Sequence, residues 1–329
     1  MRTLVVNPPS KFGWLAFTMQ SIIKIREIAK SVDIIHCHQK DFNAFAAYLI
    51  KKLYGIPYVI TVYGFTQKKR TKRKLIYNLI YNNASGVIAV SEAAEAYCQD
   101  QGFQNIRHIP PIPNYKKCDK AKGILRDQHG ISKDSTVLLF LARLRPAKRC
   151  EVLIKAFADL GNNFIRENNL ILIIVGDGEE REKLKNLIKY SDASAYIKLI
   201  GKIPNDKFQG SVSEMFGLAD LYVLPSLREG LPISLMEAMY SNLAVIGSDV
   251  RGINSLIENG QNGLLFPVDN VPKLTERIRE LVIDTERREI LAKNAGAFIN
   301  NYYPHSKVID EHLHFYQDVL GNKGLRHKI

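Results

Sequence analysis

The segment with the clearest chemical potential is residues 225–239, which read PSLREGLPISLMEAM. It follows a short apolar run typical of a strand, and Gly230 and Pro232 permit a turn before a helix begins. Backbone N–H groups at a helix start lack partners within the helix and carry partial positive charge, so they suit a diphosphate. Glu229 is expected in the loop and Glu237 in the helix, where a carboxylate can accept hydrogen bonds from two vicinal hydroxyls. The alternative is a solvated loop glutamate and a helix-capping glutamate, which would be preferred for an isolated pair.

Strand-like and helix-like runs alternate along the whole chain, which predicts βα units around parallel sheets. The expected strands are residues 33–37, 57–62, 86–90, 106–109, 136–141, 170–175, 197–200, 221–224, 244–247 and 263–266. The expected helices are residues 43–54, 91–99, 149–160, 179–190, 211–218, 235–240, 271–284 and 285–302. We therefore expect an α/β protein with two Rossmann-like, doubly wound domains that face a central cleft.

A chain of 329 residues suits two such domains. The proline-rich run at 109–114 marks the boundary between them. The expected organisation is an N-terminal domain over 1–115, a linker over 116–134, and a C-terminal domain over 135–303. A helix in 304–329 is expected to pack back on the N-terminal domain.

Several motifs of the second half occur in the order and spacing of one family. Glu229 and Glu237 form an E-x7-E pattern, residues 141–148 read LARLRPAK, residues 175–179 read VGDGE, and residues 262–267 read NGLLFP. With these motifs the chain resembles the retaining glycosyltransferases of family 4, of the group 1 type and GT-B architecture. The resemblance implies transfer of a sugar from a nucleotide-diphosphate sugar to a polysaccharide or lipid-linked acceptor, with retention. It makes the C-terminal domain the donor-binding one and the N-terminal domain the acceptor side.

The resemblance also assigns a role to each matching residue. Arg143 and Lys148 match the basic pair that grips the donor diphosphate, where fixed cations stabilise the charge left when the sugar departs. Glu229 matches the glutamate that contacts the donor sugar, and these three residues are taken as catalytic. Glu237 matches the glutamate that binds the ribose. The other donor-binding positions are Gly230, Leu231, Pro232, Ile233 and Ser234, with backbone amides toward sugar and phosphate, and Ile203, near the base.

No metal ion or other cofactor is expected. The chain contains no Asp-x-Asp, the usual carboxylate pair for a metal-bound sugar diphosphate. Arg143 and Lys148 would supply the positive charge instead. Asp177 lies in a loop that resembles a phosphate loop, but a lone Gly-x-Gly more often forms a strand-to-helix turn, and this structural interpretation is preferred.

On the acceptor side, residues 33–38 read DIIHCH and resemble the family's histidine-bearing strand. His36 and His38 share one face of that strand. Zinc is one interpretation, but no third ligand with suitable spacing is visible, so we expect His38 to line the cleft and His36 to be hydrogen-bonded inside. Tyr63 and Gly64 end the next strand. Tyr63 replaces a family histidine, and a phenol can donate a hydrogen bond but cannot act as a base near neutral pH.

Two further features depart from the family. Asn254 stands where the family has Glu, and far fewer residues precede Asp33 than the family has there. The N-terminal domain is therefore expected to be shortened, unless residues 8–13 replace the missing glycine loop, and a partner chain would cover the exposed surface. The alternative function is therefore a non-catalytic or partner-dependent nucleotide-sugar-binding subunit.

The net charge of +13 is unevenly distributed. Residues 1–120 hold 18 Lys and Arg against 7 Asp and Glu, whereas the remainder holds 28 against 26. The basic run 68–74 favours an anionic membrane surface and a solvated helix face equally. A nucleic-acid partner is not expected, because no recognisable motif accompanies the charge. The scattered cysteines and short apolar runs indicate a cytoplasmic protein, with a peripheral position on the inner face of the membrane as one option.

Overall fold

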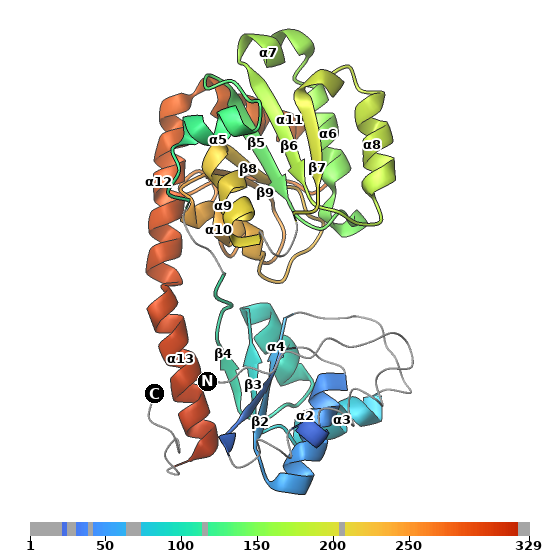
Figure 1. Cartoon of the computed structure of the whole chain (residues 1–329), viewed down its shortest axis with the longest axis vertical. Helices are drawn as coiled ribbons and strands as arrows, with labels where there is room; N and C mark the ends of the chain where they lie inside the picture. The colour runs from blue at the N-terminus through green and yellow to red at the C-terminus, as the bar shows by residue number, and fades with distance from the viewer. Residues whose placement is uncertain are drawn as a thin grey trace. The chain divides into compact units, whose positions relative to one another are not determined.

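The computed structural model describes residues 22–24, 31–38, 42–63, 74–113, 118–203 and 208–321. The chain divides into two compact units. The first unit combines Met1–Pro111 with His305–Ile329, and the second unit is Ile112–Pro304 (Figure 1). Within the described residues, no helix combines the length and apolar character needed to cross a membrane.

The first unit has a parallel sheet whose described strands lie in chain order, β1-β2-β3-β4. The strands are β1 (Ile35–Cys37), β2 (Tyr58–Val62), β3 (Gly86–Ala89) and β4 (Ile106–His108). The helices are α2 (Phe42–Tyr54), α3 (Lys74–Asn82), α4 (Glu92–Asp100) and α13 (His305–Leu320). Every residue of β2 and β3 is buried, as expected for central strands of a parallel sheet that is covered on both faces.

Helix α13 packs against this sheet although it comes from the end of the chain. Phe315 is fully buried, and a Cβ at Gly86 would lie 2.4 Å from its ring. Arg107 of β4 forms an ion pair of 2.8 Å with Asp318. The absence of a side chain at Gly86 is therefore what allows the aromatic ring to reach the sheet.

The second unit has a six-stranded parallel sheet in the order β10-β9-β8-β5-β6-β7. Its strands are β5 (Thr136–Leu141), β6 (Leu170–Val175), β7 (Ile197–Gly201), β8 (Leu221–Leu224), β9 (Ala244–Ser248) and β10 (Leu264–Phe266). Its α-helices are α5 (Lys122–Gln128), α6 (Cys150–Ala158), α7 (Asn162–Glu167), α8 (Arg181–Lys189), α9 (Phe208–Leu218), α10 (Ile233–Tyr240), α11 (Val271–Ile283) and α12 (Thr285–Tyr302).

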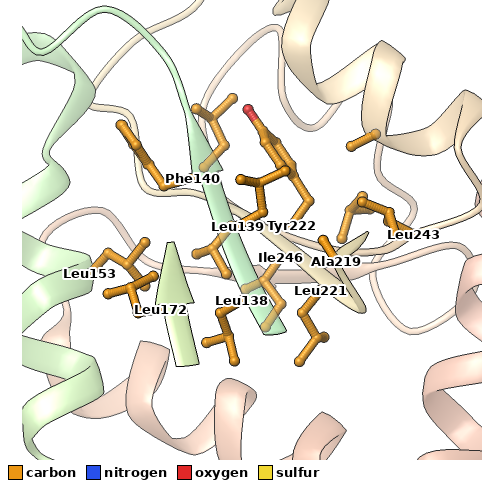
Figure 2. Close-up of a cluster of buried hydrophobic side chains, with 14 of the residues drawn as sticks. Leu138, Leu139, Phe140, Leu153, Leu172, Ala219, Leu221, Tyr222, Leu243 and Ile246 are labelled. Carbon is orange, nitrogen blue, oxygen red and sulfur yellow. The ribbon is translucent and has the colours of Figure 1, made fainter. Parts of the chain in front are cut away.

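The sequences of β5 (TVLLFL) and β6 (LILIIV) explain their central position. Uninterrupted apolar runs suit strands that are buried on both faces, and side chains from β5, β6, β8 and β9 meet in one cluster (Figure 2). Asp284 ends the preceding helix and caps α12, because its carboxylate accepts a hydrogen bond of 2.9 Å from the Arg287 N–H. The predicted fold class, two parallel-sheet α/β domains, is confirmed.

The linker predicted over 116–134 is wrong for the described part of that stretch. It contains α5, whose Leu125 is fully buried in the core of the second unit. Asp220, next to β8, accepts hydrogen bonds from Arg126 at 2.6 Å and from the Val137 N–H at 2.7 Å, and so holds α5 against the sheet. A seven-residue helix gives a weak periodic signal, which is why the charged sequence resembled a linker. Gly64 and residues 68–73 lie outside the described residues.

Candidate functional site

The strand order of the second unit favours a ligand at one edge of its sheet. From β5 the chain moves outward through β6 and β7, and it then returns to β8 on the other side of β5. Ligands of such sheets bind beyond the carboxyl ends of the strands where this direction reverses. Arg143 and Lys148 follow β5, and Glu229 follows β8. The three residues predicted as catalytic therefore follow the two strands, β5 and β8, between which the strand order reverses.

A cavity of about 590 Å³ lies at the carboxyl ends of β5, β6 and β7. Ile203 contributes an apolar part of its lining. The charged residues that line it are Arg143, Arg145, Asp177, Glu179 and Lys202. Arg143 is exposed, and within the described part of the chain its guanidinium forms no hydrogen bond or ion pair. Its guanidinium is therefore available to an anion, with a donor geometry that matches phosphate.

The two glycines of the VGDGE loop allow its backbone to pack closely against the residues that follow β5. Gly176 and Gly178 have φ values of +147° and +157°. A Cβ would lie 1.9 Å from the Ala142 carbonyl oxygen at the first position and 2.3 Å from the Leu144 carbonyl oxygen at the second. The Leu144 N–H also donates a hydrogen bond of 2.9 Å to the Asp177 carbonyl. These contacts support the structural interpretation of the loop, which in addition lines the cavity.

Lys148 and Glu229 form an ion pair between the loops that follow β5 and β8. The Glu229 side chain is only 10% exposed. The Ser226 hydroxyl donates a hydrogen bond of 2.7 Å to the same carboxylate oxygen, and the Ser248 hydroxyl donates to the Ser226 carbonyl. The Glu229 side chain is thus held in place by an ammonium and a hydroxyl donor at a position that is shielded from solvent.

Helix α10 begins without a capping side chain. Pro232 occupies the N-cap and makes no side-chain hydrogen bond, and the first turn has no acidic residue. The backbone N–H groups of Ile233 and Ser234 have no acceptor among the described residues. Gly230 and Leu231 are half-buried in the loop just before the helix. Unpaired N–H groups at this end of a helix favour an anion.

Glu237 lies in the middle of α10 and is only 7% exposed. Burial raises the pKa of its carboxyl to about 7. No hydrogen bond or ion pair joins this carboxyl to another described residue. Burial is the main cause that raises the pKa of the Tyr222 hydroxyl, and the charges of Glu229 and Glu237 add smaller contributions. An unpartnered, mostly buried carboxyl of this kind is suited to accept hydrogen bonds from ligand hydroxyls.

In the first unit, the prediction that His36 is hydrogen-bonded inside is confirmed. Its Nδ1 lies 2.6 Å from the Tyr316 hydroxyl, and its Nε2 lies 2.6 Å from the Thr61 hydroxyl. Burial, with the neighbouring His38 and His312, lowers the pKa of His36 to about 3. The imidazole is therefore neutral and has both nitrogens engaged near neutral pH.

His38 and Tyr63 end neighbouring strands of the same sheet and are both exposed. His38 Nδ1 lies 3.0 Å from the Tyr63 hydroxyl. The rings of His36 and His38 are 4.0 Å apart, as expected for side chains on one face of a strand. Burial, together with His312 of α13, lowers the pKa of His38. Across the described ranges, no group of three or more His, Cys, Asp or Glu residues is arranged to hold a metal ion.

Sequence reasoning missed the residues that support these sites. Ser226 and Ser248 hold Glu229, and Tyr222 hydrogen-bonds with Ser234 at 2.7 Å. Gly252, with φ +96°, lies so close to the loop that a Cβ would be 2.4 Å from the Gly230 carbonyl oxygen. The turn at Gly252 could have been predicted from its glycine, which tolerates positive φ. The hydrogen-bond partner of a buried serine or tyrosine cannot be predicted from the neighbouring sequence.

Comparisons with known proteins agree with this arrangement. Residues 121–298 match the family of glycosyl transferases group 1, and residues 1–114 match glycosyltransferase family 4. The chain is 26% identical over 96% of its length to the N-acetyl-alpha-D-glucosaminyl L-malate synthase of Bacillus anthracis, of which it covers 83%. It is 28% identical to the UDP-Gal:alpha-D-GlcNAc-diphosphoundecaprenol alpha-1,3-galactosyltransferase of Escherichia coli, over 93% of this chain and 81% of that protein.

Among solved structures, the chain resembles HepE of Anabaena in complex with UDP-glucose. The TM-score is 0.78 at 21% identity, over 94% of this chain and 84% of HepE. This likeness concerns the fold, and it confirms the predicted GT-B type. The match of residues 121–298 spans more than half of the sequence. The chain therefore belongs to the glycosyl transferases group 1.

Proposed function

We propose that this chain transfers a sugar from a nucleotide-diphosphate sugar to a polysaccharide or lipid-linked acceptor. The observation that carries the proposal is the group of donors at the strand reversal of the second unit. Lys148 pairs with Glu229. Among the described residues, the Arg143 guanidinium and the N–H groups of Ile233 and Ser234 at the start of α10 have no partner. Such an arrangement suits a diphosphate, because cations and a helix N-terminus act on the same anion.

The relatives support the same class of substrates. The Escherichia coli relative is named for UDP-Gal and a diphosphoundecaprenol acceptor, and HepE is bound to UDP-glucose. In this chain, Arg143 and Lys148 bind the diphosphate and stabilise the charge that develops as the anomeric carbon–oxygen bond breaks. Glu229 orients the donor sugar, and Glu237 accepts hydrogen bonds from the ribose hydroxyls. Ile203 contacts the base in the cavity.

The finer proposals concern charge and stereochemistry. We propose that the positive charge on the diphosphate comes from Arg143 and Lys148 without a metal ion, so that a chelator leaves transfer unchanged. Retention at the anomeric carbon is proposed from the E-x7-E resemblance of Glu229 and Glu237. Nuclear magnetic resonance of the first product formed would report the anomeric configuration directly.

The test is calorimetry with a panel of nucleoside diphosphates, including UDP. Each charge-assisted hydrogen bond contributes about 1.5–3 kcal/mol, so Lys148→Ala or Glu237→Ala should weaken binding roughly ten- to a hundred-fold. Lys155→Ala, which removes an exposed lysine of α6, is the matched control and should bind as the wild type does. Unchanged affinity in both site variants would sink the assignment. A hydrolysis screen over nucleotide sugars then identifies the donor.

A second function, binding a nucleotide sugar without transferring it alone, is favoured by Tyr63. The side chain is 47% exposed, but partial desolvation of its phenol raises the pKa, so this residue cannot accept a proton near neutral pH. The two functions differ in turnover with an acceptor pool. Donor affinity together with a transfer rate on the order of 1 s⁻¹ supports the transferase, whereas affinity without transfer supports the binding subunit.

A further inference from the structure

Tyr222 is the most unusual polar side chain near the proposed donor site. It lies in β8, opposite Leu139 of β5, and its side chain is fully buried. Figure 2 shows its ring among apolar side chains, with the hydroxyl oxygen at the edge of the cluster. An apolar side chain would fill this space without the cost of burying a hydroxyl. The hydroxyl therefore calls for an explanation in terms of what it contacts.

The Tyr222 hydroxyl connects the ends of two elements. It lies 3.2 Å from the carbonyl oxygen of Leu141, the last residue of β5, and 2.7 Å from the hydroxyl of Ser234, the second residue of α10. A phenol has one proton, and a carbonyl can only accept. Both contacts are satisfied when Tyr222 donates to Leu141 and accepts from Ser234. The phenol thus spans the gap between β5 and the first turn of α10.

Both connected elements carry groups of the proposed donor site. Two residues beyond Leu141 is Arg143, which lines the cavity. Ser234 belongs to the turn whose unpaired N–H groups face outward from the helix start, and the N-cap residue, Pro232, makes no side-chain hydrogen bond there. The Ser234 hydroxyl is therefore a point at which this uncapped turn is attached to the core.

We propose that Tyr222 is a positioning residue that sets the distance between the Arg143 loop and the first turn of α10, and that it acts through Ser234. The inference rests on the proposed function, since it assumes that both elements bind one diphosphate. A tyrosine suits this task because burial keeps its hydroxyl protonated, so the link persists over the whole working pH range. A misplacement of about 1 Å in such a site lowers binding or turnover strongly.

The test compares two substitutions that each remove one hydroxyl and keep the ring. Tyr222→Phe breaks the link to Ser234. Tyr240 lies at the other end of α10, and Tyr240→Phe removes a hydroxyl that donates to the Tyr303 carbonyl at the end of α12. Both variants should lose a similar few degrees of thermal stability. Only Tyr222→Phe should lose affinity for UDP, or for whichever of UDP, ADP, GDP and dTDP binds the wild type most tightly, by about tenfold.

Ser234→Ala supplies the second variant, because it removes the other partner from a half-buried position. If Tyr222 acts through Ser234, the double variant should bind no more weakly than the weaker single one. Additive losses of affinity in the double variant would show that Tyr222 does not act through Ser234. Equal losses of affinity in Tyr222→Phe and Tyr240→Phe would show that Tyr222 contributes only to stability, which would overturn the positioning role. If the wild type binds a nucleotide and Tyr222→Phe binds it with the same affinity, the positioning role is overturned and the proposed function stands. Failure of the wild type to bind all four nucleotides overturns the proposed function and this inference with it.

Discussion

The two units share an architecture but differ in the chemistry at the ends of their strands. In the second unit, the strand order reverses between β5 and β8, and charged groups follow those strands: Arg143, Lys148 and Glu229. In the described part of the first unit, the strands lie in chain order, and the strand ends carry His38 and Tyr63, with the neutral His36 behind them. One edge thus has cations and carboxylates, and the other has imidazoles and a phenol.

This difference suggests how the two substrates would be divided between the units. A diphosphate is an anion and needs fixed cations and unpaired N–H groups, which the second unit has. A sugar or lipid-linked acceptor reacts through a hydroxyl, which needs hydrogen-bond partners of either polarity rather than net charge. His38 and Tyr63 can serve as such partners because both are exposed. The predictions below test this division, beginning with the largest expected effect.

The largest effect is expected from Glu229→Ala. The substitution removes the carboxylate that we propose orients the donor sugar, and it leaves Lys148 without its partner. Turnover should fall by roughly a hundred- to a thousand-fold, as when a group that acts on the transition state is lost. Nucleoside-diphosphate affinity should change much less, because the residues proposed to contact the diphosphate, Arg143 and Lys148, remain. Initial rates of sugar transfer and calorimetry measure the two quantities.

Glu276→Ala is the matched control for this change. Glu276 forms an ion pair of 2.6 Å with Lys273 on the exposed surface of the same unit. An exposed pair contributes little to stability, so its loss should leave turnover unchanged. A similar loss of turnover in both variants would show that Glu229 supports the fold of the unit rather than the reaction.

An intermediate effect is expected from pH, with opposite signs in the two units. The pKa of Glu237 is raised to about 7 in the folded chain, so its stabilising contribution is complete below about pH 4.5 and is lost as pH rises through 7. The pKa of His36 is lowered to about 3, so its contribution is complete above about pH 6.5 and is lost as pH falls. Each change is on the order of 2 kcal/mol or more.

Peptide-resolved hydrogen exchange at pH 5 and pH 8 measures the local stability of each unit, once the rates are corrected for intrinsic exchange. Strands β1 and β2 should lose protection at pH 5, whereas β8 and α10 should lose it at pH 8. Glu237→Gln keeps the shape of the side chain without its charge, and it should abolish the trend in the second unit only. Parallel changes in both units would contradict the contrast.

The smallest effect is expected from Tyr63→Phe. The substitution removes an exposed hydroxyl that is hydrogen-bonded to His38, and it keeps the ring. Transfer should fall a few-fold with a higher KM for the acceptor, because one hydrogen bond contributes about 0.5–1.5 kcal/mol. Nucleoside-diphosphate affinity should stay the same. A loss of donor affinity instead would move Tyr63 from the acceptor side to the donor side.

Much of the second unit was predictable because its signals are local. The strands over 136–141, 170–175 and 221–224 were predicted with the bounds that the structure has. Continuous apolar runs bounded by turn residues leave few alternatives for a buried strand. The motif with Glu229 and Glu237 was recognisable because it is also local: Glu229 lies in a loop and Glu237 in the helix that follows it.

Contacts between distant segments were not predictable in this way. The sequence showed no third ligand with suitable spacing for the two strand histidines, yet the ring centroid of His312 of α13 lies 6.1 Å from that of His36. Tyr316, of the same helix, hydrogen-bonds with His36 although 280 residues separate them in the chain. Which side chains of α13 contact β1 depends on how the helix packs against the sheet, and periodicity alone does not specify that packing.

The sequence by itself determined the alternation of strands and helices, the family, and the residue types available for anion binding. Only the tertiary structure decided that Lys148 pairs with Glu229, that Ser226 and Ser248 support this pair, and that Tyr222 links β5 to α10. The physical reason is that propensity and periodicity act over a few neighbouring residues, whereas a buried polar group is satisfied by whatever the packed chain brings within about 3 Å.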